Sequence, residues 1–390
     1  MGRDRLGRSA IRVVGSAGVA GLILVAFVSR DAQSHKAVTS KYTYNEDVYP
    51  ILRDRCGRCH VSGGAAPMSL LSYKEALPWA ESIHEEVTHE RMPPWYADNA
   101  TAINGYSLTA RELDTLMVWA TGGAPEGNPE HRPEPAAARN EWLLGAPDLL
   151  IPIAAYTMPD DTQDSIRDFT VPAALGETRW LRAVDLRPGT PALVRSAIIT
   201  VDSPAASETV LNLWQPGETL SPVPEGTAFK LPADSQLRVQ IRYKRPWDAH
   251  GVMSDRSAVG LYFTGPPSPG QEVQTLPLSA APANDPDMRR FACEVRGNIR
   301  VLAVIPTLDQ PYAAFDVRAL LPDGSILPLL HLAHPRPEWD RRYWLAHPID
   351  LPEGARLEAA ATMEPPNSDA PSRAVPRARA LQIAANFVAR

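Results

Sequence analysis

Three side chains in one short stretch have the types and spacing that attach an iron porphyrin. Cys56 and Cys59 stand three positions apart, and His60 follows directly. Two thiols one helical turn apart can add to the two vinyl groups along one edge of a haem, and the adjacent histidine can bind the iron as its proximal ligand. The pattern therefore predicts one covalent haem c, with thioethers at Cys56 and Cys59 and iron ligation by His60.

Other uses of a C-x-x-C pair fit this sequence less well. A redox pair of the thioredoxin type needs a strand–helix–strand setting, which the residues around Cys56 do not indicate. A structural zinc site needs a second pair of ligands at similar spacing, but the one further cysteine, Cys293, stands alone. We interpret Cys293 as a small apolar residue of a core and not as a reactive thiol.

The second axial ligand must come from farther along the chain, and Met92 is our candidate. Two prolines follow it directly, so the loop is stiff and Met92 itself is biased towards extended backbone. A thioether opposite histidine raises the reduction potential, which suits electron transfer. The alternatives are Met68, which is close to His60 along the chain, and His84 and His89, which we expect to be solvated.

Predicted helices frame these ligands. A helix over 45–55 would deliver Cys56, and a polar helical stretch covers 73–90. Thr109 followed by Glu112 is a capping box, and the apolar residues after it recur at helical spacing until two glycines end the pattern. The expected layout is helix, attachment motif, helix, methionine loop and closing helix.

That layout resembles a known family. Residues 40–128 are similar to class I cytochromes c, because the attachment motif, the ligand loop and the closing helix occur in the family's order. The resemblance implies a small all-α cytochrome c domain. It also implies that His60 and Met92 ligate the iron from opposite sides.

The start of the chain predicts export. Basic residues up to Arg12 precede an uncharged run over 13–28, and Ala32-Gln33-Ser34 offers a cleavage site. The run is long for a signal core and slightly short for a membrane span, which takes about 20 residues. Residues 1–34 are therefore a signal peptide or an N-terminal membrane anchor. Both alternatives place the remainder in the periplasm or on the outer face of the cytoplasmic membrane.

The rest of the chain is rich in proline and in strand signals. Proline accounts for 39 of 390 residues, twice the ~5% of an average protein, which argues against long helices. A proline-rich linker over 129–140 leads to β-rich runs, and a second linker over 265–286 separates blocks at 141–264 and 287–390. We predict two tandem antiparallel β-sandwiches of jelly-roll type after the helical domain. The net charge of −6 does not indicate the basic surface that is typical of nucleic-acid binding.

Short stretches beyond residue 140 carry a second resemblance. In chain order they are 141–148, 169–172, 182–189, 259–263, 321–324, 339–343 and 351–355. Their shared order over 141–368 is similar to that of bacterial relatives of the copper type II, ascorbate-dependent monooxygenases, the group of peptidylglycine α-hydroxylating and dopamine β-hydroxylating enzymes. Bacterial members of that group often carry an N-terminal monohaem domain. The resemblance implies two monooxygenase-like β-sandwiches.

The copper ligands that the resemblance implies are missing. Arg195 and Ser196 stand where the family has a histidine pair, and Arg242 stands where it has the histidine of a His-Tyr strand. Thr307 and Asp309 occupy the segment that carries the ligands of the second copper. Guanidinium has no lone pair to give to copper. We therefore expect no copper and no monooxygenase catalysis.

Together these features favour electron transfer. We interpret the chain as an exported c-type cytochrome that exchanges single electrons with a redox protein partner or a membrane complex. Residues 13–28 would attach it to the membrane if they are retained, and the β-sandwiches would be a copper-free docking or scaffold module. Two alternatives stay open: a copper-dependent monooxygenase fed electrons by its haem domain, and a haem-containing binding or assembly subunit of a larger complex.

Overall fold

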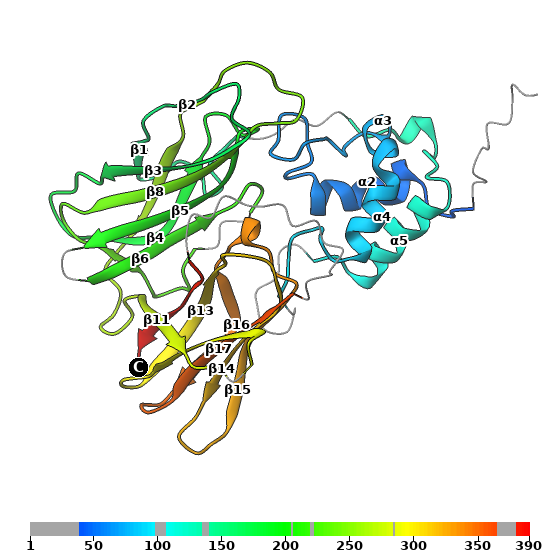
Figure 1. Cartoon of the computed structure of the whole chain (residues 1–390). Helices are drawn as coiled ribbons and strands as arrows, with labels where there is room; N and C mark the ends of the chain where they lie inside the picture. The colour runs from blue at the N-terminus through cyan, green and yellow to red at the C-terminus, as the bar shows by residue number, and fades with distance from the viewer. Residues whose placement is uncertain are drawn as a thin grey trace, which may run out of the picture.

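The protein consists mostly of antiparallel β-strands, with helices gathered in one part (Figure 1). The computed structural model describes residues 39–97, 107–134, 140–203, 206–218, 222–283, 285–364 and 380–390. The export segment expected over 1–34 lies outside these residues. Within them, no helix is both long enough and apolar enough to cross a membrane.

The described helices lie within residues 44–97 and 107–131, and they have a core of their own. The elements of this helical part are Tyr44–Val48 (η1), Tyr49–Ile51 (α2), Leu52–Cys56 (η2), Tyr73–Ala76 (α3), Leu77–Trp79 (η3), Ala80–Thr88 (α4), Ala110–Thr121 (α5) and Pro129–His131 (η4). The apolar faces of these helices enclose the fully buried Tyr44, Leu52, Leu116 and Trp119. The sequence forms this core because its apolar residues recur at helical spacing.

The predicted helices are confirmed. The expected helix over 45–55 corresponds to η1, α2 and η2, which follow one another without a break. The capping box is also present: the side chain of Thr109 accepts the backbone N–H of Glu112 at 3.2 Å, and the Glu112 carboxylate accepts the backbone N–H of Thr109 at 2.7 Å. These two bonds satisfy donors that the first turn of α5 leaves unpaired.

The expected linker over 129–140 begins with ordered contacts to the helical part. The Glu46 carboxylate accepts the backbone N–H of Asn128 at 3.0 Å and lies 3.0 Å from Nδ1 of His131. Residues 135–139 of this linker lie outside the described residues. Near the start of this segment, His131 therefore contacts the helical part.

The first β-block covers residues 149–264. Its strands are Leu149–Pro152 (β1), Tyr156–Met158 (β2), Asp164–Pro172 (β3), Arg179–Arg187 (β4), Val194–Ser203 (β5), Ala206–Trp214 (β6), Phe229–Leu231 (β7), Gln236–Lys244 (β8), Met253–Asp255 (β9) and Ala258–Thr264 (β10). Two four-stranded sheets, β1-β10-β4-β7 and β3-β8-β5-β6, and a β2-β9 ribbon form from them. Alternate residues of β8 are buried, as expected of a strand with one face on a core.

The strands of the second β-block lie within the described residues 274–283, 285–364 and 380–389. They are Gln274–Ala281 (β11), Met288–Glu294 (β12), Ile299–Thr307 (β13), Tyr312–Leu320 (β14), Ile326–Ala333 (β15), Tyr343–Leu351 (β16), Arg356–Met363 (β17) and Gln382–Ala389 (β18), with a 3-10 turn at Pro337–Trp339 (η5). They form one barrel-like sheet in the order β15-β14-β17-β12-β11-β18-β13-β16. This antiparallel arrangement is consistent with a β-sandwich.

The segment expected as a linker over 265–286 contains strand β11, so that expectation is corrected. Residues 274–278 of β11 pair with β18, and residues 279–281 pair with β12. Pro277 lies in the first of these stretches, opposite Ala384, where only one edge of β11 is paired. Proline is tolerated there because the other edge of β11 is unpaired at this point, so the N–H that proline lacks is not needed for pairing on that edge. The segment therefore belongs to the second sheet.

The two β-blocks pack directly on each other. Leu302, Trp344 and Val388 of the second block belong to the apolar core of the first. Polar contacts add to this junction: Nε2 of Gln215 donates to the carbonyl oxygen of Asp340 at 2.9 Å. The blocks thus share one core at their junction.

Asp185 in β4 is a carboxyl group buried in the first block, with 1% of its surface exposed. It accepts the backbone N–H groups of Leu143 at 3.3 Å and of Leu186 at 2.8 Å. Burial outweighs these bonds and raises the pKa of Asp185 to about 6. The folded chain therefore binds this proton more tightly than the unfolded chain does.

We expect the wild type to gain stability relative to an Asp185→Asn variant as the pH falls from about 7 to about 4. Since the folded pKa lies above the usual ~3.9, the stabilisation is complete below about pH 4 and is lost as the pH rises through 6. The gain is at most roughly 3 kcal/mol. Urea unfolding across this range measures it, and an unchanged difference between the two proteins would contradict the burial effect.

Candidate functional site

The attachment motif, residues 56–60, follows the first helical run and forms a tight turn. The backbone N–H groups of Cys59 and His60 donate to the carbonyl oxygen of Cys56 at 3.1 and 2.9 Å. The two cysteines are not joined to each other by a disulfide bond. Burial raises the pKa of Cys56 to about 12 and that of Cys59 to about 11. They differ in this from redox and nucleophilic cysteines, whose pKa is lowered.

The ring of His60 is oriented by a backbone acceptor. Its Nδ1 lies 3.2 Å from the carbonyl oxygen of Met68. A carbonyl oxygen only accepts, so Nδ1 carries the proton and Nε2 keeps its lone pair. Burial lowers the pKa of His60, which keeps the ring neutral. A neutral imidazole held in this tautomer can bind a metal through Nε2.

Met92 lies four residues after the end of α4, where the chain leaves the helices. The backbone N–H groups of Arg91 and Met92 both donate to the carbonyl oxygen of Glu86, at 2.9 and 3.2 Å. Met92 is half-buried and is followed by a cis peptide bond to Pro93. The last turn of α4 therefore fixes the start of the loop, and iron ligation by Met92 stays a prediction.

The three rival ligands are placed differently. Met68 packs its side chain against the helical core and gives its carbonyl oxygen to His60. His89 is exposed, as expected, and its Nδ1 lies 2.8 Å from the carbonyl oxygen of Glu85 in its own helix. His84 is half-buried, so the expectation that it is solvated holds only in part.

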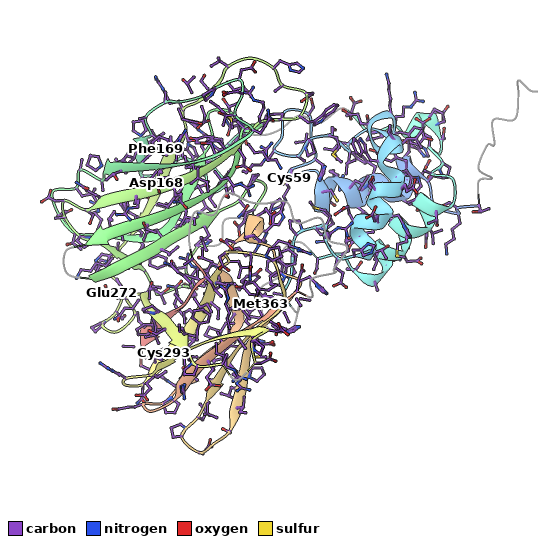
Figure 2. The ribbon with its side chains drawn as sticks, in the orientation of Figure 1. Cys59, Asp168, Phe169, Glu272, Cys293 and Met363 are labelled. Carbon is purple, nitrogen blue, oxygen red and sulfur yellow. The ribbon has the colours of Figure 1, made fainter. Side chains whose placement is uncertain are left out.

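Cys59 lies at the side of the helical part that faces the first β-block (Figure 2). Its Sγ lies 3.1 Å from the carbonyl oxygen of Pro216, and Nη1 of Arg58 donates to the carbonyl oxygen of Gly217 at 3.2 Å. Gly217 has a φ of +71°, and a Cβ there would lie 2.6 Å from Cβ of Arg58. Only glycine lets the chain after β6 approach the motif this closely.

The first copper slot, defined by Arg195, Ser196 and Arg242, is occupied by charged and hydrogen-bonded groups. Arg242 forms two bonds with the Asp164 carboxylate, at 2.6 and 3.2 Å. Arg195 stands at a bulge in β5, and its Nη1 donates to the carbonyl oxygen of Ala192 at 2.7 Å. Burial, together with the neighbouring Arg242, lowers the pKa of Arg195 to about 10, so it stays protonated at neutral pH. Arg195 is also close enough to Cys59 to influence the pKa of its thiol.

The second copper slot, defined by Thr307 and Asp309, lies in the second β-block. Thr307 is buried at the end of β13. The Asp309 carboxylate accepts the hydroxyl of Tyr312 and Nη1 of Arg289, both at 2.8 Å. Both of its oxygens are therefore engaged within the block.

Sequence reasoning missed three residues beside the attachment motif: Gly217, Trp247 and Arg341. Trp247 is 70% exposed, and its Nε1 donates to the carbonyl oxygen of Pro67 at 2.8 Å. Arg341 is buried and lowers the pKa of the Cys59 thiol, against the larger effect of burial. An exposed tryptophan after a proline is a weak signal of a contact. Gly217 gave no signal, and Arg341 stood out only as part of the stretch 339–343 of the second resemblance.

The donor set fits a covalent haem. Two protonated thiols one turn apart suit addition to vinyl groups, and the neutral His60 has an Nε2 lone pair for iron. The loop after α4 supplies a half-buried thioether at Met92. No residue at these four positions carries a charge that opposes the binding of an iron porphyrin.

Comparisons with known proteins do not place the chain in a family. No family model and no curated protein matches it. Among solved structures it is similar to PNGase F, a glycosylasparaginase from Flavobacterium meningosepticum, over 62% of this chain and 96% of that one, at 9% identity and a TM-score of 0.30. The major capsid protein P2 of bacteriophage PM2 matches over 55% of this chain and 100% of that one, at 10% identity and a TM-score of 0.21. An allantoicase matches over 52% of this chain and 74% of that one, at 8% identity and a TM-score of 0.18. At these TM-scores the likenesses carry no argument about function, and both family resemblances stay predictions.

Proposed function

We propose that this chain is an exported c-type cytochrome that carries one covalent haem and transfers single electrons to or from a partner outside the cytoplasm. The observation that supports this most is the bond between His60 Nδ1 and the Met68 carbonyl oxygen. It leaves the lone pair on Nε2 of the histidine that the C-x-x-C-H pattern assigns to iron. The partner would be a redox protein or a membrane complex in the periplasm.

Each residue of the site has a positional role in this proposal. Cys56 and Cys59 would hold the porphyrin edge, while His60 and Met92 would bind the iron. The bound haem supplies a one-electron couple. The Met68 carbonyl orients the His60 ring and makes Nε2 more basic. His60 is half-buried, so its surroundings limit the access of water, which is one of the factors that set a reduction potential.

We also propose that the β-blocks are a copper-free scaffold for the helical part. Arg242 is engaged with Asp164, and the protonated Arg195 has no lone pair to donate. The contact of Pro216 with Cys59 supports the scaffold role, because the block touches the attachment motif itself. Monooxygenase-like ancestry of these blocks remains part of the proposal.

Replacing Met92 tests the electron-transfer proposal. In Met92→Ala, we expect the oxidised protein to lose the charge-transfer band of a thioether bound to iron(III). The midpoint potential should fall by on the order of 0.1–0.3 V, because axial ligands set haem potentials over a wide range. Optical spectra and a redox titration measure both effects.

Met68→Leu is the matched control, since it removes the rival sulfur, nearly conserves side-chain volume and keeps the carbonyl that holds His60. It should retain the band and the potential. Metal analysis after incubation with copper should find one iron and no copper per chain. A Met92→Ala spectrum identical to that of the wild type would show that Met92 is not a ligand.

A further inference from the structure

The loop that carries Met92 is held at its far end by the second β-block. Ala97 forms an antiparallel bridge with Leu332 of β15. The backbone N–H of Ala333 donates to the carbonyl oxygen of Tyr96 at 3.0 Å. Since β15 is an edge strand of its sheet, the loop adds a short strand to an edge that offers main-chain groups for pairing.

Side chains of the same loop enter the second block. The ring of Trp95 lies 5.6 Å from that of Tyr343, centroid to centroid, and the Arg341 guanidinium lies 5.3 Å from the Trp95 centroid. Tyr96 is 7% exposed and belongs to the core of this block, together with Leu332. Aromatic and cation–π contacts of this kind stabilise the packing of the loop on the second block. The loop is thus anchored by main chain and side chains together.

The near end of the loop is fixed by α4, through the bonds of Arg91 and Met92 to Glu86. Only Pro93 and Pro94 separate Met92 from Trp95. Met92 therefore lies on a short, stiff strap between a helix of the helical part and an edge strand of the second β-block. A change in the contacts of Trp95, Tyr96 or Ala97 with the second β-block therefore changes where the sulfur of Met92 can lie.

The first β-block contacts the other side of the site. It touches the attachment motif through Pro216 and Gly217, and it reaches Pro67 through Trp247. Pro67 precedes Met68, whose carbonyl orients His60. The two blocks therefore contact different ligand segments: the first block contacts that of His60, and the second that of Met92.

We propose that the second β-block positions the distal ligand, holding Met92 within reach of the iron through Trp95, Tyr96 and Ala97. This inference rests on the proposed function, since it takes Met92 as the ligand. Trp95 is a positioning residue that acts through the loop. The β-blocks then have a definite task in a cytochrome without copper: they set the coordination of its iron.

Trp95→Ala in the full-length, haem-loaded protein tests the inference. We expect it to lose most of the thioether charge-transfer band. It should also bind added imidazole on the order of tenfold more tightly than the wild type, because a ligand that competes with Met92 gains when Met92 is less often bound. Ala333→Pro removes the N–H that donates to Tyr96 and should act in the same direction.

Trp142→Ala is the matched control, because Arg187 lies over Trp142 at 4.8 Å just as Arg341 lies over Trp95, but in the first block. It should keep the wild-type band and imidazole affinity. If Trp95→Ala and Ala333→Pro also keep them while Met92→Ala loses the band, the positioning role is overturned and the proposed function stands. If the wild type itself lacks the band, the ligand assignment fails first. Should Trp95→Ala fail to fold, as judged by circular dichroism, Ala333→Pro decides.

Discussion

A chain with both motif cysteines replaced, Cys56→Ala/Cys59→Ala, is expected to carry no covalent haem, whereas the wild type should carry one per chain. Thioether attachment needs a thiol opposite each vinyl group, and these two thiols are one turn apart beside His60. The effect is all or none. Mass spectrometry of the denatured chains, expressed in a host that attaches c-type haem, measures it directly.

Cys293→Ala is the control for this experiment. Cys293 is half-buried in β12 and packs against the core of the second block, whereas Cys59 lies at the helical part (Figure 2). Its replacement should leave the haem content at one per chain. Covalent haem in the double variant, or a wild type that contains a Cys56–Cys59 disulfide and no haem, would contradict the assignment.

The parts of the site that have local signals could be predicted from the sequence. The spacing of Cys56, Cys59 and His60 is a local property, and so is the capping box of Thr109 and Glu112, which the structure contains. The partner of the His60 ring could not be predicted. It is a backbone carbonyl, that of Met68, and any residue type can supply one.

Strands are also predictable where apolar and polar residues alternate clearly, as they do in β8. Strand β11 was missed because the prolines of 265–286 favour a linker, although a strand paired along one edge accepts Pro277. The pairing of the Met92 loop with β15 could not be predicted from the sequence either. Edge pairing depends on which main-chain groups meet in three dimensions. No pattern in the sequence of Trp95–Ala97 predicts that Leu332 is its neighbour.

The motifs of the second resemblance identified Arg195 and Arg242, but not the carboxylate that supplies their counter-charge. Asp164 lies on β3, next to β8, and belongs to no motif. Its carboxylate bonds to Arg242 and raises the pKa of Arg195, against the larger effect of burial. Two arginines in place of copper ligands therefore depend on one carboxylate from a neighbouring strand.

Asp164→Ala is expected to lower the free energy of unfolding by roughly 2–3 kcal/mol. The side chains of Arg242 and Asp164 are only 12% and 20% exposed, so removing the carboxylate leaves a nearly buried guanidinium without its ion-pair partner and next to Arg195. The cost stays below the ~3–5 kcal/mol of a fully buried pair because some water reaches this one. Urea unfolding of the full chain measures it.

Asp350→Ala is the control, because Asp350 forms a similar cross-strand pair with Arg300, whose side chain is 44% exposed, and a second ion pair with Arg390, whose side chain is 56% exposed. Exposed pairs contribute little, so this variant should lose about 1 kcal/mol or less. Equal losses in Asp164→Ala and Asp350→Ala would show that the first copper slot does not depend on a buried counter-ion.

The double variant Asp164→Ala/Arg242→Met separates loss of the pair from exposure of an unpaired charge. If the cost of Asp164→Ala comes from the stranded guanidinium, removing Arg242 as well should recover at least half of it, since an apolar side chain of similar length needs no partner. Arg195 then keeps its bond to the Ala192 carbonyl oxygen and loses a like-charged neighbour. A double variant as unstable as the single one would place the cost in lost packing of Asp164, and the arginines of this slot would then be tolerated without the carboxylate.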